Sequence, residues 1–260
     1  MDTPCRIIAI ANQKGGVGKT TTAINFSASL AVAEKHVLLI DIDPQGNSTS
    51  GLGFDKDKQF VTTYDILIGH ARPAEVIQNT AVKRLDLIPS NVNLIGAELE
   101  LIEIKEREFI LKKALDSVKG SYEYIIIDCP PSLGLLTINA LNAADSVLIP
   151  VQCEYYAMEG LGQLLNTVKL VRQSFNPNLK VEGILLTMYD SRNNLCNQVV
   201  REINEHFGSE VFSSVIPRNV SLSEAPSFGK PVLLYNITSK GAQSYLELAK
   251  EVMKRCSERH

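Results

Sequence analysis

The sequence lacks the features that mark membrane-spanning, secreted and metal-cluster proteins. No apolar run approaches the roughly 18 residues that a membrane-spanning helix needs. The N-terminus also lacks the basic and apolar regions of a signal peptide. The five cysteines are scattered and form no C-x-x-C pair, which favours reduced thiols over disulfides or a metal site. We therefore expect a cytoplasmic protein.

The sequence also has little excess positive charge and no sign of modular construction. Its 26 Lys and Arg residues against 29 Asp and Glu residues give a net charge of -3. Any nucleic-acid binding must therefore come from a local basic patch. We find no internal repeat, low-complexity tract or linker, so residues 1–260 are predicted to form a single domain.

A glycine-rich loop is the most informative feature that is present. Residues 14–20 read K-G-G-V-G-K-T, between a predicted strand at residues 7–11 and a segment that reads as a helix. Glycines let the backbone wrap closely around an anion, and the N–H groups at a helix start bind phosphate. In this context Lys19 reaches the terminal phosphates and the Thr20 hydroxyl ligates Mg²⁺. The loop therefore predicts a nucleoside triphosphate site made of Lys14, Gly15, Gly16, Val17, Gly18, Lys19, Thr20 and Thr21.

Short apolar runs and longer amphipathic segments alternate along the rest of the chain. The runs are residues 37–40, 85–88, 124–127, 147–149 and 184–186, and the predicted helices include 96–118, 159–175, 197–207 and 240–255. This pattern predicts an α/β fold with a doubly wound, mostly parallel sheet and helices on both faces. Ligands bind at the carboxyl ends of the strands in such sheets, so residues that follow strands should converge on one edge.

Three aspartates end predicted strands and are candidates for that edge. Asp128 follows the run 124–127 and is expected to hold Mg²⁺, through water, since that ion keeps much of its hydration shell. Asp41 and Asp43 follow the run 37–40. Alternate residues of a strand face the same way, so both carboxylates can approach the phosphates and the metal together.

Several motifs together resemble the ParA/MinD class of P-loop ATPases with a deviant Walker A loop. The loop has a second lysine, Lys14, and carries Gln13 where the ordinary pattern has glycine. Further motifs resemble the ParA/Soj chromosome- and plasmid-partitioning branch, and their order and spacing extend over nearly the whole chain. They are 41–47 (DIDPQGN), 125–131 (IIIDCPP), 150–156 (PVQCEYY), 216–220 (IPRNV) and 222–226 (LSEAP).

The resemblance implies an ATP-dependent DNA-segregation switch. Such a protein is a weak ATPase that uses Mg²⁺, forms a homodimer on ATP and binds double-stranded DNA nonspecifically. A ParB/Spo0J-like centromere-binding protein stimulates it, and it is nucleoid-associated. Whether its cargo is a chromosome origin or a plasmid stays open.

Specific roles follow from the same resemblance. Asp43 positions the attacking water, while Asp41 supports a metal site formed with Thr20 and Asp128. Lys14 crosses a two-fold interface to the phosphates of the partner's ATP, which makes Lys14, Lys19 and Asp43 the catalytic candidates. The loop with Pro217, Arg218 and Asn219 holds the adenine base, and the sequence has no guanine-type Asn-Lys-x-Asp motif.

DNA contact rests on fewer residues. Arg192 matches a basic position that the family uses for nonspecific DNA binding, and Arg218 is the second DNA-binding candidate. Ser221 stands where family members often carry arginine, which removes one charge from the patch. Arg201, Lys230 and Lys240 are further basic candidates. No helix-turn-helix segment precedes the P-loop, which argues against sequence-specific operator binding.

Two other functions compete with partitioning. A MinD-like membrane switch would need a C-terminal amphipathic helix, but residues 253–260 are polar and carry no Phe, Leu or Ile. We therefore expect no membrane partner. A metabolic or redox enzyme on the same scaffold, such as dethiobiotin synthetase or the nitrogenase iron protein, is the second alternative. The cysteines do not resemble an iron–sulfur set, and the motifs at 150–156 and 217–226 favour partitioning.

Overall fold

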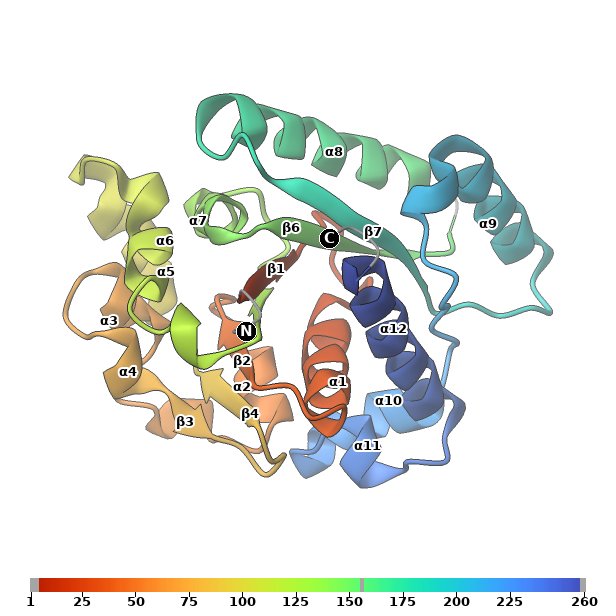
Figure 1. The fold of residues 1–260 in the computed structure, drawn as a ribbon, viewed down its shortest axis with the longest axis horizontal. Helices are drawn as coiled ribbons and strands as arrows, with labels where there is room; N and C mark the ends of the chain where they lie inside the picture. Colours follow the sequence, from red (N-terminus) through yellow and green to blue (C-terminus); the bar gives the residue numbers. More distant parts are fainter. Residues whose placement is uncertain (1–4, 155–156, 258–260) are drawn as a thin grey trace.

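A seven-stranded sheet organises the chain, in the order β3-β4-β2-β5-β1-β6-β7 (Figure 1). The computed structural model describes residues 5–154 and 157–257, so Tyr155, Tyr156 and the end of the polar tail at 258–260 lie outside the described residues. The strands are β1 (Arg6–Ile10), β2 (Val37–Asp41), β3 (Gln78–Asn79), β4 (Leu85–Ile88), β5 (Tyr124–Asp128), β6 (Ser146–Gln152) and β7 (Lys180–Thr187). Only β3 pairs antiparallel, so the mostly parallel sheet is confirmed.

Helices cover both faces of the sheet, as the sequence predicts. One face carries α1 (Lys19–Val32), α10 (Val220–Glu224), α11 (Val232–Tyr235) and α12 (Lys240–Ser257), with α1 packed beside α12 (Figure 1). The other face carries α3 (Thr63–Leu67), α5 (Leu94–Glu100), α6 (Ile110–Leu115), α7 (Leu135–Ala143), α8 (Ala157–Ser174) and α9 (Asn194–Phe207). Two short helices, α2 (Asn47–Gly51) and α4 (Pro73–Val76), complete the α-helical set in the described ranges.

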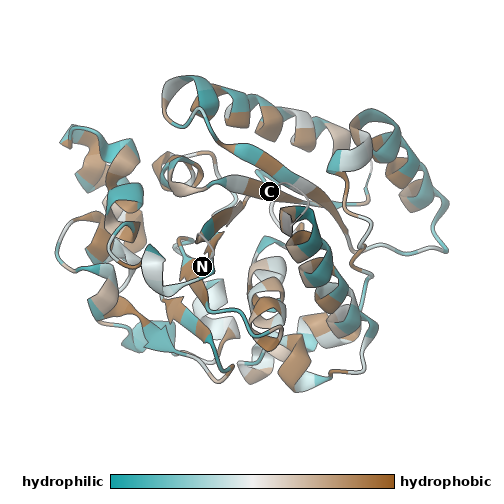
Figure 2. Ribbon diagram, viewed as in Figure 1, coloured by the Kyte–Doolittle hydropathy of each residue, from teal (hydrophilic) through white to brown (hydrophobic). Residues whose placement is uncertain are grey.

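Alternation along the strands divides the core into two layers. Ile8 and Ile10 of β1 pack with α1 and α12, whereas Ile7 and Ala9 pack into the opposite cluster. Hydrophobic residues concentrate along these central strands (Figure 2). Burial on both faces explains why the strands read as continuous apolar runs rather than as alternating ones.

The predicted helix over 96–118 is wrong as a single element. The chain instead forms α5, a 3₁₀ turn η2 (Leu101–Glu103), a 3₁₀ turn η3 (Arg107–Phe109) and α6, with Glu106 in the left-handed region at φ 56°. Two asparagines of α7 satisfy backbone groups at this break. Asn139 donates to Arg107 O at 2.9 Å, and Asn142 donates to Glu108 O at 2.7 Å. Tertiary hydrogen bonds therefore compensate for the helical bonds that the break removes.

Residues 214–216 form no regular strand in the described chain. Isolated bridges flank them, Val211 with Ile184 of β7 and Pro217 with Tyr189, and Ile216 N donates to Leu186 O at 2.9 Å. Tyr189 N then donates to Ile216 O at 3.1 Å. These bonds bring the residues after 216 beside the end of β7, at the edge where the P-loop lies.

Across the described ranges, no helix is both long enough and apolar enough to cross a membrane.

Candidate nucleotide-binding site

The glycine-rich loop joins β1 to α1 at the carboxyl edge of the sheet. Gly16 and Gly18 have φ values of 73° and 88°, a region that glycine adopts without the steric penalty of other residues. Lys19 is only 7% exposed, and its Nζ donates to Lys14 O at 3.1 Å. Thr187 Oγ1 donates to Val17 O at 2.8 Å, so the last residue of β7 supports the loop. The loop is thus shaped as an anion cradle by this chain alone.

Asp128 lies at the end of β5, fully buried beside the start of α1. Ser48 Oγ donates to its Oδ2 at 2.7 Å, and the Thr20 hydroxyl lies near enough to this carboxylate to lower its pKa. Its Oδ1 has no hydrogen-bond partner in the part of the chain that the structure describes. Burial, and then the charge of Asp41, raise the pKa of Asp128 to about 8.

An orphaned buried oxygen beside a threonine hydroxyl fits a Mg²⁺ site. Mg²⁺ in phosphate-binding proteins takes one or two protein oxygens and fills its remaining positions with phosphate and water. No cluster of three or more His, Cys, Asp or Glu residues that could hold a metal exists within residues 5–154 and 157–257. Thr20 and Asp128 are the residues that would hold Mg²⁺, with its remaining positions open to phosphate and water.

Asp41 and Asp43 lie beside this site, but Asp41 has partners that the sequence did not predict. Its carboxylate accepts from Asp43 N at 3.1 Å and from Thr49 N and Oγ1, both at 2.8 Å. Burial raises the pKa of Asp41 to about 6. These bonds fix α2 and the backbone of Asp43. A role of Asp41 in supporting the metal stays a prediction, and it acts at least in part by positioning its neighbours.

The carboxylate of Asp43 is held at the carboxyl edge of the sheet, where the P-loop lies. It is 6% exposed, and its Oδ1 accepts from Gln45 N at 2.9 Å. Ser90 Oγ donates to its backbone carbonyl at 2.8 Å. Hydrogen bonds therefore hold the loop after β2 internally, through Gln45, and to the segment after β4, through Ser90.

Lys14 does not extend freely from the loop. Its Nζ forms an ion pair with Glu154 Oε2 at 2.9 Å, and both side chains are partly exposed, at 36% and 48%. Sequence reasoning assigned Lys14 to a partner's phosphates and gave Glu154 no role, although Glu154 lies in the quoted motif at 150–156. The signal was too weak because a lone glutamate in a loop carries no spacing pattern.

A hollow of about 330 Å³ lies between the P-loop and the loop after residue 216. Its lining includes Gly18 and Thr21 with Met188, Pro217, Arg218, Asn219 and Tyr245. Asn219 Oδ1 is buried and lacks a hydrogen-bond partner among the described residues. An amide oxygen accepts from the amino group of a base. The structure thus places Pro217, Arg218 and Asn219 beside the P-loop, and their role in holding the adenine base stays a prediction.

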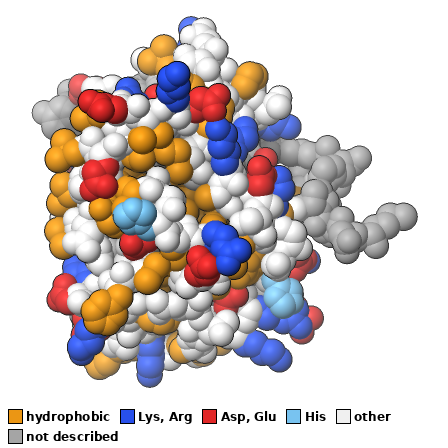
Figure 3. All heavy atoms as spheres, turned by 90° about the vertical axis from the view of Figure 1, so that its left-hand side faces the viewer, with side chains coloured by type: hydrophobic (Ala, Val, Ile, Leu, Met, Phe, Trp, Pro, Cys, Tyr) orange, Lys and Arg blue, Asp and Glu red, His pale blue; other side chains and the backbone are white. Residues whose placement is uncertain are grey.

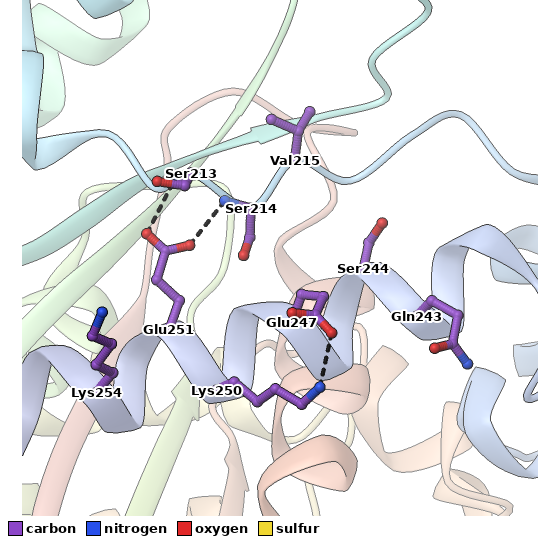
Figure 4. Close-up of a pocket in the computed structure, with 9 residues that line it drawn as sticks. All are labelled: Ser213, Ser214, Val215, Gln243, Ser244, Glu247, Lys250, Glu251 and Lys254. Carbon is purple, nitrogen blue, oxygen red and sulfur yellow. Dashed lines mark hydrogen bonds and ion pairs between the residues drawn. The ribbon is translucent and has the colours of Figure 1, made fainter.

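A larger hollow of about 600 Å³ lies elsewhere, between α12 and residues 213–215 (Figure 4). Figure 4 shows Glu251 directed at the neighbouring backbone, where it accepts from Ser213 N and Ser214 N at 2.8 Å each. Lys250 pairs with Glu247 at 2.9 Å on the same helix. No P-loop residue lines this hollow. Glu251 therefore anchors residues 213–215 to α12.

The two arginines predicted to bind DNA converge on Asp190. Arg192 has an 88% exposed side chain and bonds both oxygens of Asp190, at 2.9 and 2.8 Å. Arg218 N donates to Tyr189 O at 3.0 Å. Hydrogen bonds from Arg192, with a smaller effect of the Arg218 charge, lower the pKa of Asp190 to about 2. The further candidates Arg201, Lys230 and Lys240 are all exposed.

Known proteins resemble the chain over almost its entire length. The family model described as AAA domain matches residues 5–181. The sporulation initiation inhibitor protein Soj of Bacillus subtilis is 60% identical over 247 residues, which is 95% of this chain and 98% of the relative. The chromosome partitioning protein ParA of Myxococcus xanthus is 58% identical over 250 residues, covering 96% and 88% of the two chains.

Solved structures give the same picture of the fold. A Mycobacterium smegmatis protein named cobyrinic acid a,c-diamide synthase, with a bound ATP analog and magnesium, superposes with a TM-score of 0.87. It is 39% identical, and the match covers 98% of this chain and 97% of the other. The glycine loop, Thr20 and Asp128 therefore lie in a fold that holds an adenine nucleotide and magnesium in a relative.

Proposed function

This chain is a member of the ParA/Soj family of chromosome-partitioning ATPases, and from that premise we propose that it is an ATP-dependent DNA-segregation switch. It is a P-loop ATPase that binds ATP and uses Mg²⁺ as cofactor. The proposed cycle begins when ATP drives two copies together. The dimer then binds double-stranded DNA without sequence preference and is nucleoid-associated until a ParB-like centromere-binding protein stimulates hydrolysis.

One observation carries the assignment of the nucleotide site. The unpartnered Asp128 oxygen lies beside Thr20, at the start of the helix that the glycine loop opens. Lys19 serves the β- and γ-phosphates, and Thr20 with Asp128 holds Mg²⁺, which neutralises phosphate charge when bound. Asp43 positions the attacking water from the adjoining loop. Asn219 accepts a hydrogen bond from the adenine amino group, with Pro217 and Arg218 beside it.

Dimerisation on ATP depends on the exposed half of the loop. Gly15 and Gly16 are both exposed, which leaves the loop surface open to a second molecule. The ion pair of Lys14 with Glu154 is partly solvated, and such pairs contribute only about 0–1 kcal/mol. The phosphates of a partner's ATP carry several negative charges, so they compete successfully with Glu154 for the Lys14 ammonium. Lys14 thereby links dimerisation to nucleotide state and adds positive charge at the transferred phosphate.

Nonspecific DNA binding rests on Arg192 and Arg218. The pair lies on one exposed loop surface, whereas the chain as a whole is slightly acidic. Two copies of this patch on an ATP dimer raise the affinity through bivalency, without any new contact. Arg192 shares its guanidinium with Asp190 in the free protein, so phosphate must compete with that carboxylate.

A synthase of the kind named for the Mycobacterium smegmatis structure is the second candidate. That protein is 39% identical, whereas Soj and ParA are 60% and 58% identical, and this difference favours partitioning.

The decisive experiment measures binding to nonspecific plasmid DNA with ATP, with ADP and without nucleotide. Hydrolysis is assayed in parallel with and without a ParB-like protein, and liposome sedimentation tests the membrane alternative. We expect DNA binding only with ATP and hydrolysis that rises with DNA and the ParB-like protein together. Sedimentation with liposomes, or DNA binding indifferent to nucleotide, would contradict the proposal.

A further inference from the structure

Two buried cysteines from distant parts of the sequence lie together beside the nucleotide edge. Cys153 follows β6 and is 6% exposed, and Cys196 lies in the first turn of α9 and is 3% exposed. Both belong to the same apolar cluster of the core, and both are free thiols in this structure. Burial, and then the neighbouring Cys196 thiol, raise the pKa of Cys153. We refer to these two residues as the cysteine pair.

Hydrogen bonds of other groups hold the cysteine pair together independently of the thiols. Cys153 N donates to the carbonyl oxygen of Thr187, the last residue of β7, at 3.4 Å. Two residues further along, Tyr189 Oη donates to Asn197 Oδ1 at 2.9 Å, and Asn197 directly follows Cys196. The end of β7 therefore fixes the backbone of Cys153 on one side and the start of α9 on the other.

Cys153 directly precedes the residue that holds Lys14. The Glu154 carboxylate pairs with Lys14 Nζ at 2.9 Å, and Glu154 N donates to Gln152 O at 2.8 Å. A covalent bond from Cys153 to α9 restricts the backbone next to Glu154. An exposed ion pair is weak partly because its side chains lose conformational entropy, so prior restriction of one partner strengthens the pair. Lys14 then leaves Glu154 less readily.

The cysteine pair is separate from the exposed apolar surface of the molecule. Figure 3 shows hydrophobic side chains among charges of both signs on the side that carries α3, α5 and α6. Helix α9 lies on the opposite side of the ribbon view (Figure 1). A change at the cysteine pair therefore acts on α9 and the nucleotide edge, and not directly on that apolar surface.

We propose that the cysteine pair is an oxidation site, and that its disulfide restrains Glu154 beside Lys14 and so weakens the ATP dimer. The effect on the dimer rests on the proposed function. Cytosolic disulfides are usually transient and redox-sensing, and this one forms and is reduced again in the same way.

The oxidant is a peroxide, and the reaction balances in two steps. One cysteine sulfur attacks the O–O bond of hydrogen peroxide and becomes a sulfenic acid, with release of one water. The sulfur of the second cysteine then displaces the sulfenic hydroxyl as a second water, and the S–S bond forms. Two thiols and one peroxide thus give one disulfide and two waters. The sulfurs are oxidised and the peroxide oxygens are reduced.

The first test treats the full chain with hydrogen peroxide and detects the bond by mass spectrometry. We expect the intact mass to fall by two hydrogen atoms and digestion to give linked peptides that carry Cys153 and Cys196. Dithiothreitol should reverse both changes. The thiolate is the reactive form, so the raised pKa of Cys153 should make bond formation faster at about pH 9 than at about pH 7.

Two alanine variants identify the site. Cys196→Ala should give no linked product and should hydrolyse ATP as wild type does under reducing conditions. Cys5→Ala is the matched control, because Cys5 is a half-buried thiol outside the pair. It should form the disulfide as wild type does. Absence of the linked product from wild type, or its persistence in Cys196→Ala, would overturn the oxidation site.

The second test compares the ATP dimers of reduced and oxidised protein by light scattering with Mg²⁺. Each dimer releases two weak ion pairs, so the oxidised dimer should be about fivefold weaker. Glu154→Gln should form the disulfide without any change in its dimer. An oxidised wild-type dimer as strong as the reduced one would overturn the effect on dimerisation. If the disulfide forms but neither redox state dimerises on ATP, the proposed function fails and the oxidation site stands.

Discussion

The substitution Gly15→Val tests whether the P-loop meets a second molecule. An ideal Cβ at Gly15 finds no atom within 4 Å among the described residues, and the φ of Gly15 lies outside the left-handed region. A side chain can therefore start at position 15 of the single chain without a clash at its Cβ. We expect the thermal stability of the monomer not to fall, because replacing glycine also reduces the entropy of the unfolded chain. Any loss of function must then arise between molecules.

The size of the effect follows from two-fold symmetry. A two-fold dimer places the substitution twice at the same interface, and overpacking costs about 1–3 kcal/mol at each site. The sum of about 2–6 kcal/mol corresponds to a dimer weakened from about 30-fold to more than about 10,000-fold. ATP itself should still bind, since a Cβ at Gly15 meets no atom of the described loop within 4 Å.

Light scattering with Mg²⁺ and ATP measures this outcome, with nucleotide affinity determined separately by titration. Gly120→Val is the matched control, because a Cβ at Gly120 also meets nothing within 4 Å of it in the described chain and lies away from the P-loop. We expect dimers from wild type and from the control, and monomers from Gly15→Val. An ATP-dependent dimer of Gly15→Val with wild-type affinity would refute the cross-interface role of the loop.

The remaining predictions concern the phosphates, the water, the pH and DNA. Lys19→Ala should abolish or greatly weaken productive ATP binding, measured by titration with dimerisation as a second readout. Asp43→Ala should bind ATP and dimerise but not turn over, which a phosphate-release assay checks. Burial raises the pKa of Asp128 to about 8, above the unfolded value of about 4, so the folded state binds this proton more tightly. Mg²⁺-free protein should therefore lose stability as the pH rises from about 4 to about 8. Melting at pH 6 and 8 tests this, and Asp128→Asn should remove the trend. Arg192→Ala should weaken binding to all DNA sequences alike and lower the salt slope by roughly 0.9 per lost contact, while Asp190→Asn should strengthen binding.

Sequence patterns predicted the sheet and the P-loop because both have short-range signatures. Strands buried on both faces are continuous apolar runs, and left-handed positions in a tight loop require glycine, as at Gly16 and Gly18. The helix over 96–118 failed for the opposite reason. No proline or glycine marks its break, which depends on Asn139 and Asn142, more than thirty residues further along the chain.

The hydrogen-bond partners of the three carboxylates could not be predicted from the sequence either. The spacing predicted that the three aspartates lie at one edge of the sheet. It did not predict that Ser48 donates a hydrogen bond to Asp128 and that Thr49 donates one to Asp41. Those partners come from a five-residue helix, too short for its own periodic signal. The unpaired oxygen of Asp128 is visible only once every neighbouring donor has been located.

The P-loop with Lys19 is already shaped for phosphate binding in a single chain, whereas Lys14, the proposed catalytic lysine, is paired with Glu154. One chain alone braces the loop through Thr187 and closes Lys19 over it, so the cradle for phosphate exists before dimerisation. Lys14, in contrast, is held by Glu154, a partly solvated partner that contributes little. We therefore expect a monomer to bind ATP with its own residues but to lack a second cation at the terminal phosphate. If hydrolysis needs a partner's Lys14, as we propose, a monomer holds ATP without hydrolysing it, and turnover becomes possible only once the dimer has formed.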